Sequence, residues 1–188
     1  HPYVSGAIGV TGTPAANELA ADADVVLAVG TRLQDFTTGS HSLYAKARLV
    51  SINAATFDAI KWGGAAVEAD ATLALDALDA ALGGWTSDPA WQERSKKLNR
   101  AWQHAIGDIT TSSRAALPTY AEVIGAVQSS VPDSPADDIG VCAAGTLPAE
   151  MHKLWRSSVP GGYHMEYGYS CMGYEVAGGL GVKMARPD

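Results

Sequence analysis

Side chains that can do chemistry gather in the segment from Tyr163 to Glu175. It holds tyrosines, glutamates, a histidine and a cysteine, and its pattern predicts a short strand, a tight turn and a helix that begins near Met172. The predicted helix also carries closely spaced glycines, each of which costs about 1 kcal/mol relative to alanine. Such glycines suit a helix that another backbone or a ligand approaches closely. Polar chemistry at the start of a helix is therefore indicated, and a glycine-rich core helix after a turn is the alternative.

His164 and Glu166 are the candidate catalytic residues of this segment. They occupy alternate positions of the predicted strand 163–167 and therefore face the same way. Histidine and glutamate are common proton-transfer groups, so both can donate a proton to a substrate, with structural hydrogen bonding as the alternative. His152 and Cys171 rank lower, because a buried thiol usually only packs.

Composition excludes several classes of protein. The 188 residues are 47% hydrophobic with a net charge of −7, which fits one folded domain or two small ones. The lysines and arginines are scattered, so the basic surface of a nucleic-acid-binding protein is absent. No apolar run approaches the roughly 18 residues that a membrane helix needs. Two cysteines, Cys142 and Cys171, are too few for a disulfide scaffold, and we expect a cytoplasmic protein with reduced thiols.

The first half of the chain alternates predicted strands and helices. The apolar run 25–30 is typical of a strand that is covered on both faces. Further strands are predicted at 49–53 and from Val67, and helices at 14–21, 42–47 and 72–82. This order predicts an α/β fold with a doubly wound parallel sheet, in which ligands favour the crevice beyond the strand ends.

The second half predicts a smaller α/β unit after two helices. The helices are expected at 90–109 and 120–131, and a strand at 137–145, a helix at 149–156 and the strand 163–167 follow them. A strand, helix and strand in this order form a parallel pair whose carboxyl ends share one edge. Residues 145–147 and 166–172 should therefore open on the same side, which is where we predict the site.

The amino-terminal segment offers a weaker candidate for anion binding. Gly6, Gly9 and Gly12 are spaced three apart and lack the spacing of a dinucleotide fingerprint. Their amides can face an anion at a helix start, and a plain connecting loop is the alternative. Arg32 can likewise hold a phosphate or pair with Asp35 at the surface.

The chain resembles the thiamine diphosphate-dependent enzymes over nearly its whole length. ADVVLAVGTR at 23–32 and DFTTG at 35–39 are similar to their middle domain, in the form found in acetohydroxyacid synthases. EYGYSCMGYE at 166–175 closely resembles the diphosphate-binding domain of the trihydroxycyclohexanedione hydrolase branch. The resemblance implies a middle domain at 1–115 and the amino-terminal part of the diphosphate-binding domain at 116–188, and hence a fragment of such an enzyme.

The resemblance also implies roles for individual residues. Met172 matches the bulky side chain that props the cofactor in its bent form, a role that suits a soft and adaptable side chain. The backbone groups of Ser170 and Met172 match those that bind the aminopyrimidine ring. The implied cofactor-binding residues are Gly145, Thr146, Leu147, Ser170, Met172 and Gly173.

Parts of the family's machinery are expected elsewhere. The glutamate that activates the cofactor belongs to another domain, and the motif that binds Mg²⁺ is expected after Asp188. Glu175 and Ala177 replace the glycine and proline usual in synthases, which favours the hydrolase branch.

The implied activity is the hydrolysis of a carbon–carbon bond in a cyclic 1,2-dione, which opens the ring to a deoxyglucuronate in inositol breakdown. The implied cofactors are thiamine diphosphate and Mg²⁺, the expected assembly is a homodimer or homotetramer, and the fragment alone is expected to be inactive. One alternative is a carboligase of the acetohydroxyacid synthase type, which a flavin beside Arg32 and Gly39 would favour. The other is a non-catalytic nucleotide-binding or assembly module that uses the loop from Gly6 to Gly12.

Overall fold

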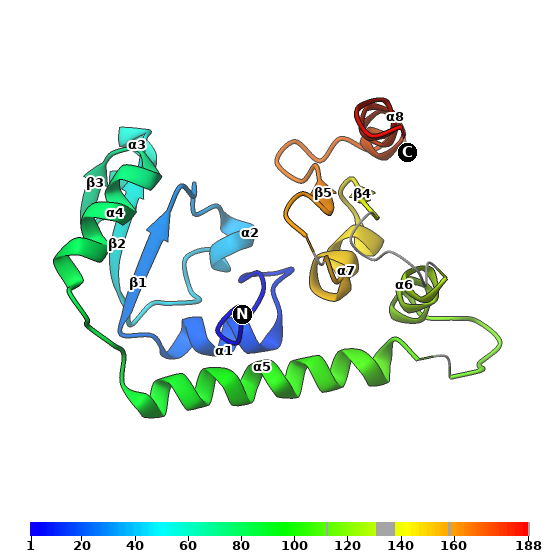
Figure 1. Cartoon of the computed structure of the whole chain (residues 1–188), viewed down its shortest axis with the longest axis horizontal. Coiled ribbons are helices and arrows are strands. Elements are labelled where there is room, and N and C mark those ends of the chain that lie inside the picture. Colours follow the sequence, from blue (N-terminus) through cyan, green and yellow to red (C-terminus); the bar gives the residue numbers. More distant parts are fainter. Residues whose placement is uncertain (112, 131–137, 158, 188) are drawn as a thin grey trace. The chain divides into compact units, whose positions relative to one another are not determined.

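The structure is a computed structural model that describes residues 1–111, 113–130, 138–157 and 159–187 (Figure 1). The chain divides into two compact units, His1–Trp102 and Gln103–Asp188. The boundary between family domains at residues 115 and 116 stays a prediction.

A three-stranded parallel sheet organises the first unit. Its strands are β1 (Val25–Val29), β2 (Arg48–Asn53) and β3 (Ala65–Glu68), in the order β1-β2-β3. The helices of the unit are α1 (Pro14–Asp22), α2 (Asp35–Thr38), α3 (Thr56–Ile60) and α4 (Ala71–Leu82). In Figure 1, α3 and α4 lie against the sheet, and both contact β2. The predicted α/β class is confirmed.

Local signals explain where these helices begin. Thr13 caps α1 because its hydroxyl accepts a hydrogen bond from the Ala16 amide at 3.0 Å. Pro14 follows at the first helical position, where its missing N–H costs nothing. Asp70 caps α4 by accepting from the amides of Thr72 and Leu73.

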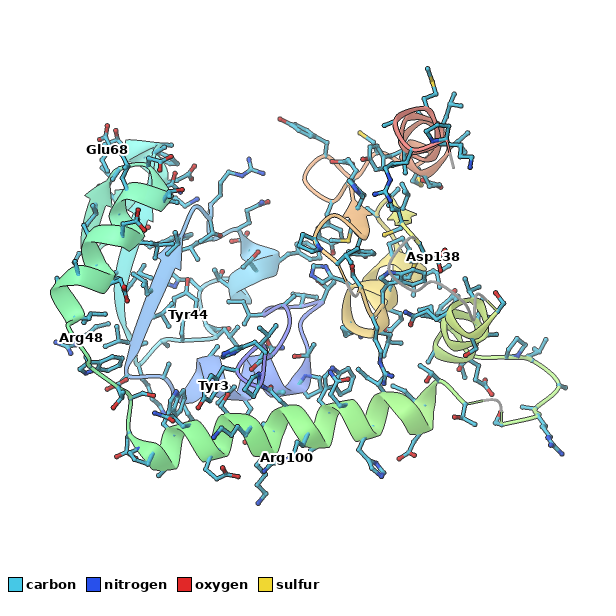
Figure 2. All side chains as sticks on the ribbon, in the orientation of Figure 1. Tyr3, Tyr44, Arg48, Glu68, Arg100 and Asp138 are labelled. Atoms are coloured by element: carbon cyan, nitrogen blue, oxygen red, sulfur yellow. The ribbon has the colours of Figure 1, made fainter. Side chains whose placement is uncertain are left out.

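One hydrophobic cluster of the first unit packs on the face of β2 that carries Leu49. Ala28, Leu33, Tyr44 and Leu49 are buried together, and Figure 2 shows Tyr44 inside this unit. Val25 and Leu27 are each 42% exposed, so the prediction that their strand is covered on both faces is wrong for this chain. Val25 and Leu27 lie at alternate positions and share one face of β1, which stays open, while Ala28 on the other face is buried.

Two helix predictions in this unit need correction. Residues 42–47 form turns and no helix, because Ser40 and His41 adopt left-handed backbone angles that break a helical path. The short helix α2 instead falls in the predicted loop. Helix α4 forms as predicted, but Leu73 is 70% exposed, so its leucine stripe is not a core face.

Helix α5 (Pro89–Ile109) begins in the first unit and ends in the second. Asp88 starts it by accepting a hydrogen bond from the Ala90 amide at 2.7 Å. Within the first unit, Arg94 of α5 pairs with Glu18 and Asp22 of α1. Arg100, labelled in Figure 2, projects from α5 into solvent and pairs with Glu93.

The second unit contains a two-stranded parallel sheet. Its elements are α6 (Tyr120–Ser129), β4 (Gly140–Cys142), α7 (Thr146–Leu154), β5 (Tyr163–Met165) and α8 (Tyr174–Ala185). Strands β4 and β5 pair with Gly140 opposite Tyr163 and Cys142 opposite Met165, which confirms the strand–helix–strand unit. The strands are shorter than predicted, and α7 begins three residues earlier than expected. The predicted end of the helix at 131 and the first residue of the strand at 137 lie outside the described residues.

Helix α6 packs closely on the end of α5. A Cβ atom added to Gly125 would lie 2.3 Å from the Thr110 carbonyl oxygen, which is far inside van der Waals contact. Thr119 and Glu122 form a capping box at the start of α6. The Glu122 carboxylate accepts from the amides of Thr119 and Ser113, and these bonds lower its pKa to about 2. Gly125 and the ionised Glu122 therefore fix how α6 packs on the end of α5.

We expect Gly125→Ala to lower the free energy of unfolding by about 1–3 kcal/mol, because the methyl group forces the two helices apart. Gly107→Ala is the matched control, since a Cβ there meets nothing within 4 Å. Removing glycine from an open helix position should stabilise α5 by about 1 kcal/mol. Denaturant unfolding of both variants measures the two effects, and equal stability of the two variants would contradict the close packing.

Candidate functional site

The predicted site lies where β4 and β5 end. The Glu166 amide donates to the Cys142 carbonyl oxygen at 3.1 Å, which continues the pairing beyond the last strand residues. The carboxyl ends of both strands therefore share one edge of the sheet, as the parallel topology predicts. This edge carries the start of α7 on one side and the segment 166–173, which we call the turn, on the other.

The start of α7 exposes backbone donors at this edge. Gly145 precedes the helix with φ 134°, a conformation that favours glycine, and its carbonyl accepts from the Ala149 amide. Thr146 and Leu147 form the first helical turn, so the predicted loop 145–147 is in fact a helix start. The first amides of a helix have no partner within it, and they carry a partial positive charge that favours an anion.

The turn is shaped by hydrogen bonds to one carboxylate. Glu166 accepts from the amides of Tyr169 and Cys171, each at 2.8 Å. These two bonds hold the pKa of Glu166 below its usual range, Cys171 having the larger effect. Ser170 between them has φ 55°, and Gly173 has φ 92° at the start of α8. Helix α8 therefore begins at Tyr174, two residues later than predicted.

Met172 projects outward from the turn. Its side chain is 87% exposed and that of Tyr169 is 86% exposed. Among the residues that the structure describes, the backbone groups of Ser170 and Met172 make no hydrogen bond. The turn thus offers free donors, free acceptors and an apolar side chain to whatever lies over it.

The two predicted catalytic residues have separate partners. The His164 ring is exposed, and its Nε2 lies 2.9 Å from the Gly161 carbonyl oxygen, before the strand. Glu166 lies one residue beyond β5, and its carboxylate contacts the turn after the strand. The prediction that both side chains face the same way does not bring them together, because His164 contacts Gly161 and Glu166 contacts the turn.

Buried polar groups near β4 and β5 were not predicted. The Tyr163 hydroxyl lies 3.1 Å from the Cys142 sulfur and 3.5 Å from the Met165 sulfur. Burial raises the pKa of both Cys142 and Tyr163. The contact between Tyr163 and Cys142 follows from the strand register. The sequence does not specify the register of a strand pair this short, so the contact could not be predicted. Burial lowers the pKa of His152, whose Nδ1 has no hydrogen-bond partner among the described residues.

The first unit gives no support to the anion site at its glycine-rich start. The Gly9 amide donates to Asn17 Oδ1 at 2.7 Å, and the Gly12 amide donates to the Gly9 carbonyl oxygen at 3.0 Å. Both amides are therefore bonded to the loop itself or to α1, as in a plain connection. No ion pair joins Arg32 to Asp35 in the part of the chain that the structure describes.

A cavity of about 560 Å³ lies in the first unit, and none of the predicted site residues lines it. The described ranges contain no group of three His, Cys, Asp or Glu residues that could hold a metal ion. No helix in those ranges is long and apolar enough to cross a membrane.

Family comparisons agree with both units. Residues 1–78 match the central domain of thiamine pyrophosphate enzymes, and residues 143–188 match their C-terminal TPP-binding domain. The chain carries parts of two thiamine pyrophosphate enzyme domains. The predicted family is confirmed, and thiamine diphosphate is the cofactor that the matched domains indicate. The match at 143–188 contains both the start of α7 and the turn.

Three proteins that are similar to this chain carry the same name. The chain is 41% identical over 209 residues to a 3D-(3,5/4)-trihydroxycyclohexane-1,2-dione hydrolase of Geobacillus thermodenitrificans, covering 100% of this chain and 32% of the relative. Proteins of the same name from Bacillus subtilis and Clostridium perfringens are 35% and 33% identical, covering 97% and 100% of the chain. The chain thus spans about a third of the length of the curated relatives it matches.

The two cysteines should differ sharply in reactivity. Cys171 is exposed at the turn, whereas Cys142 is buried and its raised pKa lowers its thiolate fraction. We expect a thiol reagent such as iodoacetamide to label Cys171 of the native chain rapidly and Cys142 slowly. The substitution Cys171→Ser should therefore abolish the rapid labelling. Rapid labelling of Cys142 in the folded variant, located by mass spectrometry, would contradict the burial of β4.

Proposed function

We propose that the chain is part of a thiamine diphosphate-dependent hydrolase that cleaves a carbon–carbon bond of a cyclic 1,2-dione in inositol breakdown. The observation that carries this proposal is similarity along the whole chain to hydrolases named for that substrate. Because the chain spans about a third of those relatives, the proposal concerns a longer polypeptide, called here the full-length protein. The 188 residues alone are proposed to be inactive.

The exposed turn fits the cofactor that the matched domains indicate. The free backbone groups of Ser170 and Met172, with Gly173 beside them, would hold the aminopyrimidine ring, and the Met172 side chain would support the bent cofactor. Gly145, Thr146 and Leu147 would line the other side. When bound, thiamine diphosphate supplies a carbanion and an electron sink for cleavage beside a carbonyl group.

The metal is proposed to be held by residues outside this chain. Magnesium prefers oxygen ligands and commonly joins phosphate groups to carboxylates. The family resemblance assigns Mg²⁺ and most contacts to the diphosphate to other parts of the full-length protein. A homodimer or homotetramer and a cytoplasmic location belong to the proposal as expectations from the family resemblance.

His164 is the side chain that we propose for proton transfer. A carbonyl oxygen can only accept, so His164 Nε2 donates its proton to the Gly161 oxygen. In the neutral ring Nδ1 is then the free base. His164 lies on β5, and its ring turns back toward Gly161 before the strand, so the proposed proton transfer requires the ring to leave that contact and turn toward the substrate.

The test is the reaction itself. The full-length protein with thiamine diphosphate and Mg²⁺ should convert 3D-(3,5/4)-trihydroxycyclohexane-1,2-dione to one ring-opened carboxylic acid, detected by mass spectrometry as addition of one water. Removal of the metal with EDTA should abolish turnover, and added Mg²⁺ should restore it.

Conversion of pyruvate to an acetohydroxy acid without ring opening would contradict the proposal in favour of the carboligase alternative. Absorbance of a bound flavin in the purified protein would point the same way. Tight binding of a nucleotide without either reaction would favour the non-catalytic module.

A further inference from the structure

Glu166 occupies a fixed place between the sheet and the turn. Its amide donates to the Cys142 carbonyl oxygen at 3.1 Å, so its backbone is anchored to the end of β4. Its side chain reaches forward, where Oε1 accepts from the Tyr169 amide and Oε2 from the Cys171 amide. A single residue therefore ties the turn to the sheet at two points.

This arrangement does not suit a proton donor. A carboxylate that accepts two amide hydrogens is favoured in its ionised form, in keeping with the lowered pKa of Glu166. A general acid must hold its proton at the working pH. The two bonds of Glu166 instead serve the shape of the backbone that follows it.

The turn needs such a restraint. Ser170 lies between the two bonded amides and has φ 55°, a left-handed conformation that is strained for a non-glycine residue. The side chains of Tyr169 and Met172 are almost fully exposed, so their packing does not hold the turn in place. Strained residues persist where surrounding contacts fix them, and here the Glu166 carboxylate supplies those contacts.

We propose that Glu166 is a positioning residue whose carboxylate fixes the backbone from Tyr169 to Cys171, so that Ser170 and Met172 face the thiamine ring in one geometry. This inference rests on the proposed function and assigns to Glu166 a role other than proton transfer. It also makes the position specific for glutamate, because only a carboxylate of that reach accepts both amides at once.

The experiment compares Glu166→Gln and Glu166→Asp with the unaltered full-length protein. Glutamine keeps the length but replaces one acceptor oxygen with a donor, while aspartate keeps the charge but shortens the reach. Glu175→Gln is the matched control, since among the described residues that carboxylate accepts only from the nearby Gly173 amide, at 3.2 Å. Hydrogen–deuterium exchange on peptides covering 165–175 reports whether the Glu166 carboxylate holds the Tyr169 and Cys171 amides, an arrangement called here the clamp. Calorimetric titration with thiamine diphosphate reports the effect of the clamp on cofactor affinity.

Both Glu166 variants should exchange the Tyr169 and Cys171 amides about tenfold faster, the order expected for losing a charge-assisted hydrogen bond. Glu175→Gln should leave those two amides unchanged. The Glu166 variants should also bind thiamine diphosphate about tenfold more weakly, with the shape of the pH profile of kcat/KM unaltered.

Three results would overturn the inference. Unchanged exchange in both variants removes the clamp. Faster exchange with unchanged cofactor affinity and turnover removes its link to the site. Loss of one limb of the pH profile with unchanged affinity makes Glu166 a proton-transfer group. If the unaltered protein itself binds no thiamine diphosphate, the proposed function fails together with the positioning role, and the exchange data separately record whether the clamp exists.

Discussion

The parallel pairing of β4 with β5 is the constraint on which the site depends. Two short strands in register, continued by the bond from the Glu166 amide to the Cys142 carbonyl, bring residues far apart in sequence to one edge. Parallel strands require a crossover, and α7 provides it. The start of that helix and the turn after β5 are therefore neighbours by topology. Loss of this pairing would separate the two halves of the proposed cofactor site.

The first unit also contains parallel strands whose carboxyl ends meet at one edge, but no comparable site is found there among the described residues. Its Gly9 amide is already bonded to the Asn17 side chain of α1. Its core is small, and the leucines of α4 and the valine at the start of β1 remain exposed. The chemistry indicated by sequence and structure is therefore concentrated in the second unit.

The sequence predicted most of the fold because strong local signals specify it. The helices predicted at 14–21 and 90–109 begin at Pro14 and Pro89, at or next to the predicted residue, and apolar runs correctly located β1 and β2. The helix predicted at 42–47 was wrong: Ser40 and His41 adopt left-handed angles directly before it, and local hydrogen bonds to Asp35 and Thr38 fold this segment into turns, which helical propensity does not report.

The candidate site was predicted in outline but not in detail. The strand–helix–strand pattern placed the start of α7 and the turn on one edge, and the motif at 166–175 indicated the cofactor. The contacts of the Glu166 carboxylate were not predictable, because they depend on how the backbone folds back over three and five residues. The Cys142–Tyr163 pair depends on register in the same way.

The central claim is that the turn supports a thiamine ring over Met172. Its most direct test is Met172→Ala in the full-length protein, with the exposed Met184→Ala on α8 as control. Because Met172 is 87% exposed in this chain, its truncation should change the free energy of unfolding by less than about 0.5 kcal/mol. A misplaced cofactor should nonetheless lower kcat on the order of 100-fold. Unchanged kcat together with unchanged affinity for thiamine diphosphate would contradict the claim.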